Sequence, residues 1–136
     1  MTDTNEVQAT TQSAAPATIY LFVYGTLRSD RSAASRLDGC ERVMKATVNG
    51  TLYGLDGHPA LMLYGSTPVH GEIWRCPAEL IWQLDDYEGI DSGLFRRVAV
   101  EIEGLPCWTY VAGPRLAHEL TPARRIPGGD WTPDPV

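Results

Sequence analysis

The segment IYLFVYGTLR at residues 19–28 decides the expected fold. Its first five residues are apolar, rich in residues that favour strands, and too few for a buried helix. Such a run is typical of a strand buried on both faces, so we expect it near the middle of a sheet or barrel. The run ends at Gly25, where the chain can expose successive backbone N–H groups to an anionic or carbonyl oxygen. An ordinary strand-ending turn is the alternative interpretation of this segment.

Outward from this strand, the sequence predicts several short strands and few helices. The strand-like segments are residues 47–53, 60–63, 69–74, 95–102 and 107–112. Glycine and proline predict turns between them, including one at residues 65–68. The pattern predicts an α+β fold, in which a small, mostly antiparallel β-barrel is flanked by short helices.

One helix is clear in the sequence, over residues 77–87. Pro77 suits its first position, an apolar stripe follows at helical spacing, and Gly89 suits its end. The Ala/Ser-rich residues 31–37 could form two further helical turns.

The chain of 136 residues fits one domain, expected over residues 19–136. Residues 1–18 are mostly Thr, Gln, Ser and Ala without an apolar period, and we expect them to form a disordered tail. The segment IPGGDW at residues 126–131 is expected to pack back on the body of the domain.

Charge and composition exclude several classes of function. The net charge is −6 and no basic cluster exceeds two residues, which argues against nucleic acid or an anionic membrane as a partner. No apolar run approaches the roughly 20 residues that span a bilayer. Cys40, Cys76 and Cys107 lack metal or disulfide spacing. Reduced thiols and the absence of a signal peptide together predict a cytoplasmic protein.

The segment LDDYEG at residues 84–89 places three carboxylates at a helix C-terminus, where the helix dipole and mutual repulsion disfavour them. Glu88 lies roughly on the side of the apolar stripe. A carboxyl turned inward there would have a raised pKa, as a general acid or base needs. A solvated acidic helix end is the alternative interpretation, and Glu72 in GEIW is a rival candidate for the base.

Five segments together resemble the gamma-glutamylcyclotransferase-like family over about residues 19–131. They are FVYGTLR at 22–28, LDDYEG at 84–89, FRRVAV at 95–100, WTYV at 108–111 and IPGGDW at 126–131. The use of YGTL with LDDYEG resembles the gamma-glutamylamine branch more than the glutathione-related branch. The resemblance implies a small β-barrel with flanking helices and a cavity at the mouth of the barrel.

The resemblance also implies an activity on a small-molecule γ-glutamyl substrate. In that family, the substrate's α-amine attacks its own γ-carbonyl, giving 5-oxoproline and a free amine. The catalytic glutamate corresponds to Glu88, and Tyr110 is expected to line the pocket. The binding loop corresponds to Tyr24, Gly25, Thr26 and Leu27. An intramolecular attack needs no protein nucleophile, metal or organic cofactor.

Two features leave alternatives open. Residues 29–35 lack the glycine and asparagine associated with the family, and Arg28 is either a pocket cation or solvent-exposed. A non-catalytic ligand-binding module on the same fold is the main rival function. An interaction protein without a pocket is a third interpretation, which the internal glycine loop disfavours.

Overall fold

The computed structural model describes residues 17–28, 31 and 33–132, and its centre is a five-stranded sheet in the order β3-β4-β2-β6-β5. The strands are β2 (Thr18–Val23), β3 (Glu41–Leu55), β4 (His58–Pro77), β5 (Phe95–Ile102) and β6 (Leu105–Ala112). All neighbours are antiparallel except β2 and β6, which run parallel. The expected α+β class with a small, mostly antiparallel sheet is therefore confirmed.

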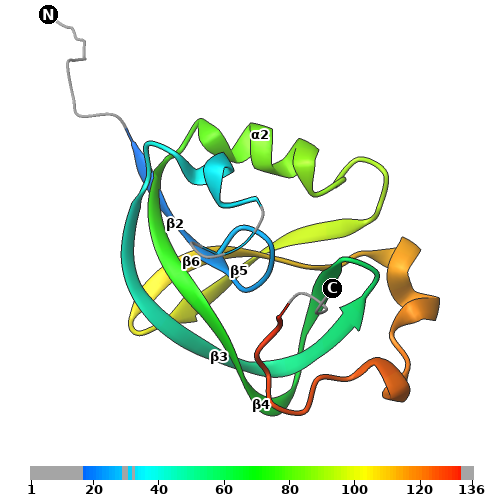
Figure 1. Cartoon of the computed structure of the whole chain (residues 1–136). Coiled ribbons are helices and arrows are strands. Elements are labelled where there is room, and N and C mark those ends of the chain that lie inside the picture. The colour runs from blue at the N-terminus through cyan, green and yellow to red at the C-terminus, as the bar shows by residue number, and fades with distance from the viewer. Residues whose placement is uncertain (1–16, 29–30, 32, 133–136) are drawn as a thin grey trace, which may run out of the picture.

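The sheet is strongly curved, because β3 and β4 are long strands that bend around the core (Figure 1). Its hydrogen-bonded order ends at β3 on one side and β5 on the other. Over the described residues no ladder joins these two edges, so closure of the sheet into the expected small β-barrel stays a prediction.

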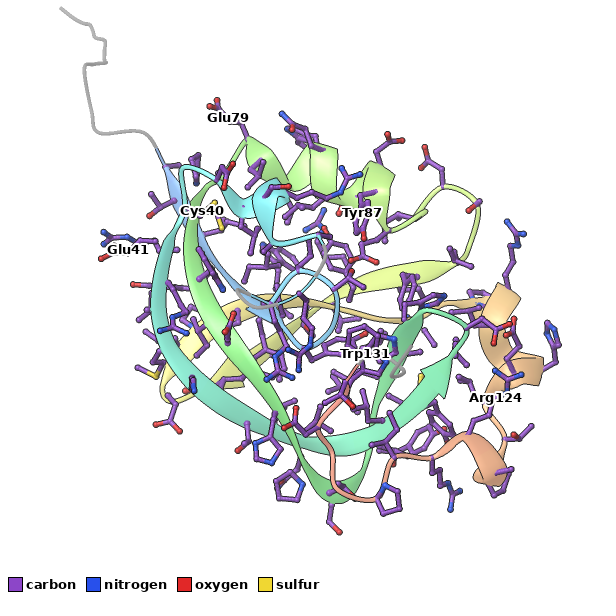
Figure 2. All side chains as sticks on the ribbon, viewed as in Figure 1. Cys40, Glu41, Glu79, Tyr87, Arg124 and Trp131 are labelled. Atoms are coloured by element: carbon purple, nitrogen blue, oxygen red, sulfur yellow. The ribbon has the colours of Figure 1, made fainter. Side chains whose placement is uncertain are left out.

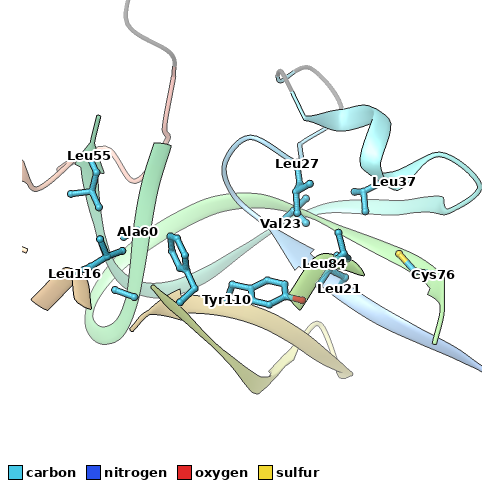
Figure 3. Packing of buried hydrophobic residues seen from close by; sticks show 12 residues of the cluster. Leu21, Val23, Leu27, Leu37, Leu55, Ala60, Cys76, Leu84, Tyr110 and Leu116 are labelled. Atoms are coloured by element: carbon cyan, nitrogen blue, oxygen red, sulfur yellow. The ribbon is translucent and has the colours of Figure 1, made fainter. Parts of the chain in front are cut away.

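Strand β2 lies in the middle of the sheet, as its apolar sequence predicts. Leu21 is paired with Trp74 of β4 on one side and with Trp108 of β6 on the other. Its alternate side chains enter two separate apolar clusters: Leu21 belongs to one and Phe22 to the other, each at most 1% exposed. Figure 3 shows the first cluster, in which Tyr110 lies among aliphatic side chains.

Helix α2 (Leu80–Tyr87) covers the sheet next to the short 3-10 helix η1 (Ala34–Leu37) (Figure 1). Ile81 and Leu84 of the expected apolar stripe are buried. The predicted start at Pro77 is wrong, because Pro77 is the last residue of β4 and pairs with Thr18. Within residues 31–37, of which residue 32 lies outside the described residues, Ala34–Leu37 form one short 3-10 helix in place of the two expected turns.

The predicted turn at residues 65–68 is also wrong. Strand β4 continues through this segment, and its pairing with β3 jumps from Gly50↔Thr67 to Thr51↔Met62. The additional residues of β4 are accommodated as an irregularity, at which Gly65 takes a positive φ of 93°. The three short strands expected between residues 47 and 74 are therefore parts of two long ones.

The chain after β6 passes through the 3-10 helices η2 (Pro114–Glu119) and η3 (Pro122–Arg124) and returns to the sheet. Ile126 N–H donates to the Leu52 carbonyl at 2.8 Å, and the Gly129 carbonyl accepts from His70 N–H at 2.8 Å. Trp131 lies inside the curve of β3 and β4 (Figure 2) and is 7% exposed. The expectation that residues 126–131 pack on the body is confirmed.

The predicted tail at residues 1–18 falls outside the described residues except for its last two, and Thr18 already belongs to β2. The three cysteines are free thiols, with Cys76 and Cys107 buried. No helix in the part of the chain that the structure describes is long and apolar enough to cross a bilayer.

Trp131 should contribute strongly to stability, because its ring is buried in the cluster that contains Phe22. We expect Trp131→Ala to lower the free energy of unfolding by about 3 kcal/mol, measured by urea denaturation. Trp82 on α2 is 70% exposed and provides the control. Trp82→Ala should change stability by no more than about 0.5 kcal/mol. Equal losses in both variants would contradict the packing described for the C-terminal segment.

Candidate active site

A cavity of about 340 Å³ opens where β2 ends. Its lining comes from residues 22–27, 57–59, 87–88 and 94–95 together with Tyr110, and so from segments far apart in the chain. The volume lies at the lower end of the roughly 300–1,000 Å³ of small-molecule sites. All six residues expected at the site from the sequence line this one cavity.

The loop after β2 presents a row of backbone donors. Within the described residues, no hydrogen bond uses the N–H groups of Gly25, Thr26 or Leu27. The same loop is held by its carbonyls: Gly25 accepts from Arg28 N–H at 3.1 Å, and Thr26 accepts from Ala33 N–H at 2.8 Å. A fixed loop with unpaired N–H groups suits an anionic oxygen.

Gly25 is required by the close approach of this loop to the hairpin between β3 and β4. A Cβ atom at Gly25 would lie 2.7 Å from Cγ of Pro59, which lines the cavity. Any side chain here would therefore displace the loop or the Pro59 ring.

Tyr24 contributes a wall to the cavity. Its hydroxyl donates to the Tyr110 carbonyl at 2.6 Å and accepts from Leu61 N–H at 3.2 Å. Burial, with a smaller effect from the Glu88 charge, raises the pKa of Tyr24 far above its usual range. The phenol therefore stays neutral, and both of its hydrogen bonds are structural.

Glu88 stands at the C-terminal end of α2, where its N–H donates to the Leu84 carbonyl at 2.9 Å. The next residue, Gly89, has a φ of 69°, which ends the helix as the sequence predicts. Tyr87 connects this helix end to the loop of residues 24–27, since its hydroxyl lies 3.0 Å from Oγ1 of Thr26. This contact links the loop to the helix end that carries Glu88.

Burial raises the pKa of Glu88 from 4.5 to about 7, while the nearby Arg36 guanidinium lowers it. Arg36 lies on η1 with its guanidinium carbon 3.9 Å from the centre of the Tyr87 ring. Across the described chain, the Glu88 carboxylate has no hydrogen-bond donor. A carboxyl with a pKa near neutral pH can act as base and acid in turn.

Asp85, one turn before Glu88, makes contacts that the sequence did not indicate. Arg97 of β5 binds it through two nitrogens, at 2.9 Å to Oδ1 and 3.1 Å to Oδ2. Tyr110 of β6 donates its hydroxyl to Asp85 Oδ1 at 2.7 Å. Arg97 and Tyr110 lie directly opposite each other on β5 and β6. The sequence could have indicated their contacts with Asp85 only if the register of these two strands had been known.

The two other charged candidates lie elsewhere. Glu72 is outside the cavity lining, and its carboxylate accepts from Trp74 Nε1 at 3.0 Å and from Arg42 at 3.4 Å. Arg28 is also outside this lining and binds Asp130 at 2.7 Å, so it fastens the C-terminal segment. In the described part of the chain, no three His, Cys, Asp or Glu side chains are grouped to hold a metal ion.

A comparison with protein families supplies the assignment. The family model described as gamma-glutamyl cyclotransferase, AIG2-like, matches residues 21–133. The chain belongs to this family. No curated protein sequence matches the chain significantly.

Solved structures with this family's fold resemble the chain at low sequence identity. An uncharacterized protein from Pyrococcus horikoshii superposes with a TM-score of 0.68 at 21% identity, covering 82% of this chain and 88% of that one. An AIG2-like protein from Mus musculus gives 0.66 at 20% identity, covering 85% and 88%. A gamma-glutamyl cyclotransferase gives 0.59 at 16% identity, covering 71% and 67%. At these identities the likeness shows the shared fold.

The raised pKa of Glu88 makes the stability of this family member depend on pH. Because the folded state disfavours the carboxylate, the free energy of unfolding should fall as pH rises from about 4.5 to about 7, by at most roughly 3 kcal/mol. Glu88→Gln removes this penalty. We expect the variant to be more stable than the parent at pH 8 and equally stable at pH 4.5, measured by urea denaturation. A stability difference that does not change with pH would contradict the burial of a titrating carboxyl.

Proposed function

We propose that this protein is a gamma-glutamyl cyclotransferase that converts a γ-glutamyl amide into 5-oxoproline and a free amine. One observation carries the proposal: a half-buried carboxyl whose pKa is raised to about 7 lines the same small cavity as a loop in which three backbone N–H groups have no partner among the described residues. The family includes gamma-glutamyl cyclotransferases, which supports the reaction type.

The binding loop would hold an anionic oxygen of the substrate. The N–H groups of Gly25, Thr26 and Leu27 suit either the glutamyl α-carboxylate or the oxyanion that develops at the γ-carbonyl. A preorganised donor of this kind is worth roughly 3 kcal/mol of transition-state stabilisation when it meets an oxyanion. The link between Thr26 and Tyr87 keeps these donors at a fixed position relative to Glu88.

Glu88 would move the proton that the reaction must transfer. The neutral α-amine attacks the γ-carbonyl carbon, and the Glu88 carboxylate takes the proton that the attacking nitrogen loses. The resulting carboxylic acid then donates that proton to the amide nitrogen as its bond to the γ-carbon breaks. One C–N bond forms and one breaks, and Glu88 returns to its starting state. The nucleophile belongs to the substrate, so proximity supplies much of the rate.

The leaving amine would lie against the part of the cavity lining that His58, Pro59, Leu94 and Phe95 form. None of the described residues that line the cavity is Lys or Arg. An amine that carries its own carboxylate would therefore lack a cation in direct contact. This favours γ-glutamylamines, the branch that YGTL and LDDYEG resemble, over glutathione.

The decisive assay incubates the protein with γ-glutamyl amines, γ-glutamyl-lysine, γ-glutamyl amino acids and glutathione, and detects 5-oxoproline by mass spectrometry. We expect Glu88→Gln to lower turnover of the best substrate by about 10²–10⁴-fold, because the amide cannot take up the proton. The Glu88→Gln variant should still bind the ligand, because the proposed binding contacts come from the loop of residues 24–27.

Glu72→Gln is the matched control, because Glu72 is a buried carboxylate outside the cavity. Its turnover should stay within a few-fold of the parent. A folded Glu88→Gln protein that forms 5-oxoproline at the parental rate would reject the mechanism. Binding of γ-glutamyl compounds without any 5-oxoproline would instead identify a ligand-binding module.

Arg36 gives an independent test through pH. Since its charge lowers the pKa of Glu88, Arg36→Gln should raise that pKa further. The acidic limb of kcat/KM, expected near pH 7 in the parent, should then move to higher pH. Arg96→Gln provides the control, because Arg96 is an exposed arginine outside the cavity lining and should leave the limb unmoved. Identical profiles for the parent and Arg36→Gln would contradict titration of Glu88.

A further inference from the structure

Tyr110 is one of the residues that line the cavity, and its hydroxyl proton is already used in a hydrogen bond. Its O–H donates to Asp85 Oδ1 at 2.7 Å. A phenol has one proton, so the remaining hydrogen-bonding capacity of Tyr110 Oη is that of an acceptor. Tyr110 is only 3% exposed, and the ring is fixed within the core cluster.

The direction of this hydrogen bond is imposed by Arg97. Its guanidinium binds both oxygens of Asp85, in the paired geometry that favours an ionised carboxylate. Arg97 is itself held over the Trp108 ring, with its guanidinium carbon 4.3 Å from the ring centre. A carboxylate has no proton to give, so Tyr110 must be the donor.

The second charged group at this wall is Glu88, three residues after Asp85 on α2. Burial, followed by the hydrogen bond to Asp85 and the charges of Asp85 and Glu88, raises the pKa of Tyr110 far above its usual range. Tyr110 therefore remains a phenol. Tyr110 and Glu88 both line the cavity. Their two acceptors, Tyr110 Oη and the Glu88 carboxylate, are complementary to a group that carries several N–H donors.

We propose that Asp85, fixed by Arg97, is a positioning residue that orients the Tyr110 hydroxyl as a hydrogen-bond acceptor for the α-amino group of the substrate. Tyr110 and Glu88 together then select ligands with an α-amine and aim the nitrogen that attacks. The identity of this amine as part of a γ-glutamyl group rests on the proposed function. The simpler role for Asp85 is to dock α2 on β5 and β6, and the experiment must separate the two.

The two roles of Asp85, orienting Tyr110 or docking α2, are distinguished with two probes that differ only in the α-amine. These probes are L-glutamine and glutaramate. Their dissociation constants are measured by chemical-shift titration, which also detects any 5-oxoproline formed in the same sample. Tyr110→Phe keeps the ring and removes the acceptor. It should weaken L-glutamine binding by about 10-fold or more and glutaramate binding by less than about 2-fold.

A double-mutant cycle then tests Asp85. Asp85→Asn should weaken L-glutamine binding about as much as Tyr110→Phe does, and should add nothing in the Tyr110→Phe background. If Asp85 acted by docking α2, its loss would persist in that background, because Glu88 would be displaced in both cases. Melting temperatures of all variants identify any general loss of folding.

Equal weakening of both probes by Tyr110→Phe, an Asp85→Asn effect that is the same in both backgrounds, or a parent that binds neither probe would overturn this inference. Formation of 5-oxoproline with unchanged discrimination between the probes rejects it and leaves the proposed function intact. Discrimination that depends on Tyr110 and Asp85, without 5-oxoproline from any γ-glutamyl compound, rejects the proposed function alone.

Discussion

The arrangement of the molecule depends on the burial of the second half of β2, residues 21–23. This strand is bonded on both edges, to β4 and to β6, and its side chains enter apolar clusters on both faces. A strand in that position has no room for polar side chains. The polar groups therefore lie after the end of β2, where the chain leaves the sheet and the backbone of residues 24–27 supplies N–H donors. The neighbours β4 and β6 lie on either side of that end and close the cavity around it.

The surroundings that suit Glu88 to its proposed role work against stability. An apolar environment raises the pKa of the carboxyl, and the folded protein at neutral pH must accommodate part of that charge. The helix end that carries Glu88 is unfavourable for carboxylates in any case, because the helix dipole points its negative end there. The ion pair between Asp85 and Arg97 offsets this by supplying a cation at the same helix end. Asp85 of the LDDYEG segment is thereby paired with a cation, while Glu88 has no ion-pair partner among the described residues.

The parts of the site that the sequence predicted are those built within one local segment. The end of a buried strand and the end of an amphipathic helix each reveal themselves by periodicity and by a glycine, so Gly25 and Glu88 could be identified. The contacts of Asp85 could not be identified, because its partners Arg97 and Tyr110 lie 12 and 25 residues further along the chain.

The helix start was misplaced because it, too, depends on a contact far away in the sequence. Pro77 has good local chemistry for a helix, but its pairing with Thr18 across the sheet prevails. The hairpin of β3 and β4 was divided into short pieces because Gly65 resembles a turn residue when it is in fact part of an irregular strand.

The parallel pair of β2 and β6 has a consequence for the order in which the protein can be made. Leu21 cannot pair with Trp108 until β6 has been synthesised. Most of the chain therefore has to leave the ribosome before the central strand gains its second neighbour. The hairpin of β3 and β4 closes over short distances and can offer β2 one edge early, whereas the other edge stays unpaired until β6 appears. During that interval the apolar run at residues 19–23 is a template for pairing with another nascent chain. Exposure of that edge during synthesis is therefore an aggregation risk of this topology, and it falls on the strand that leads into the proposed binding loop.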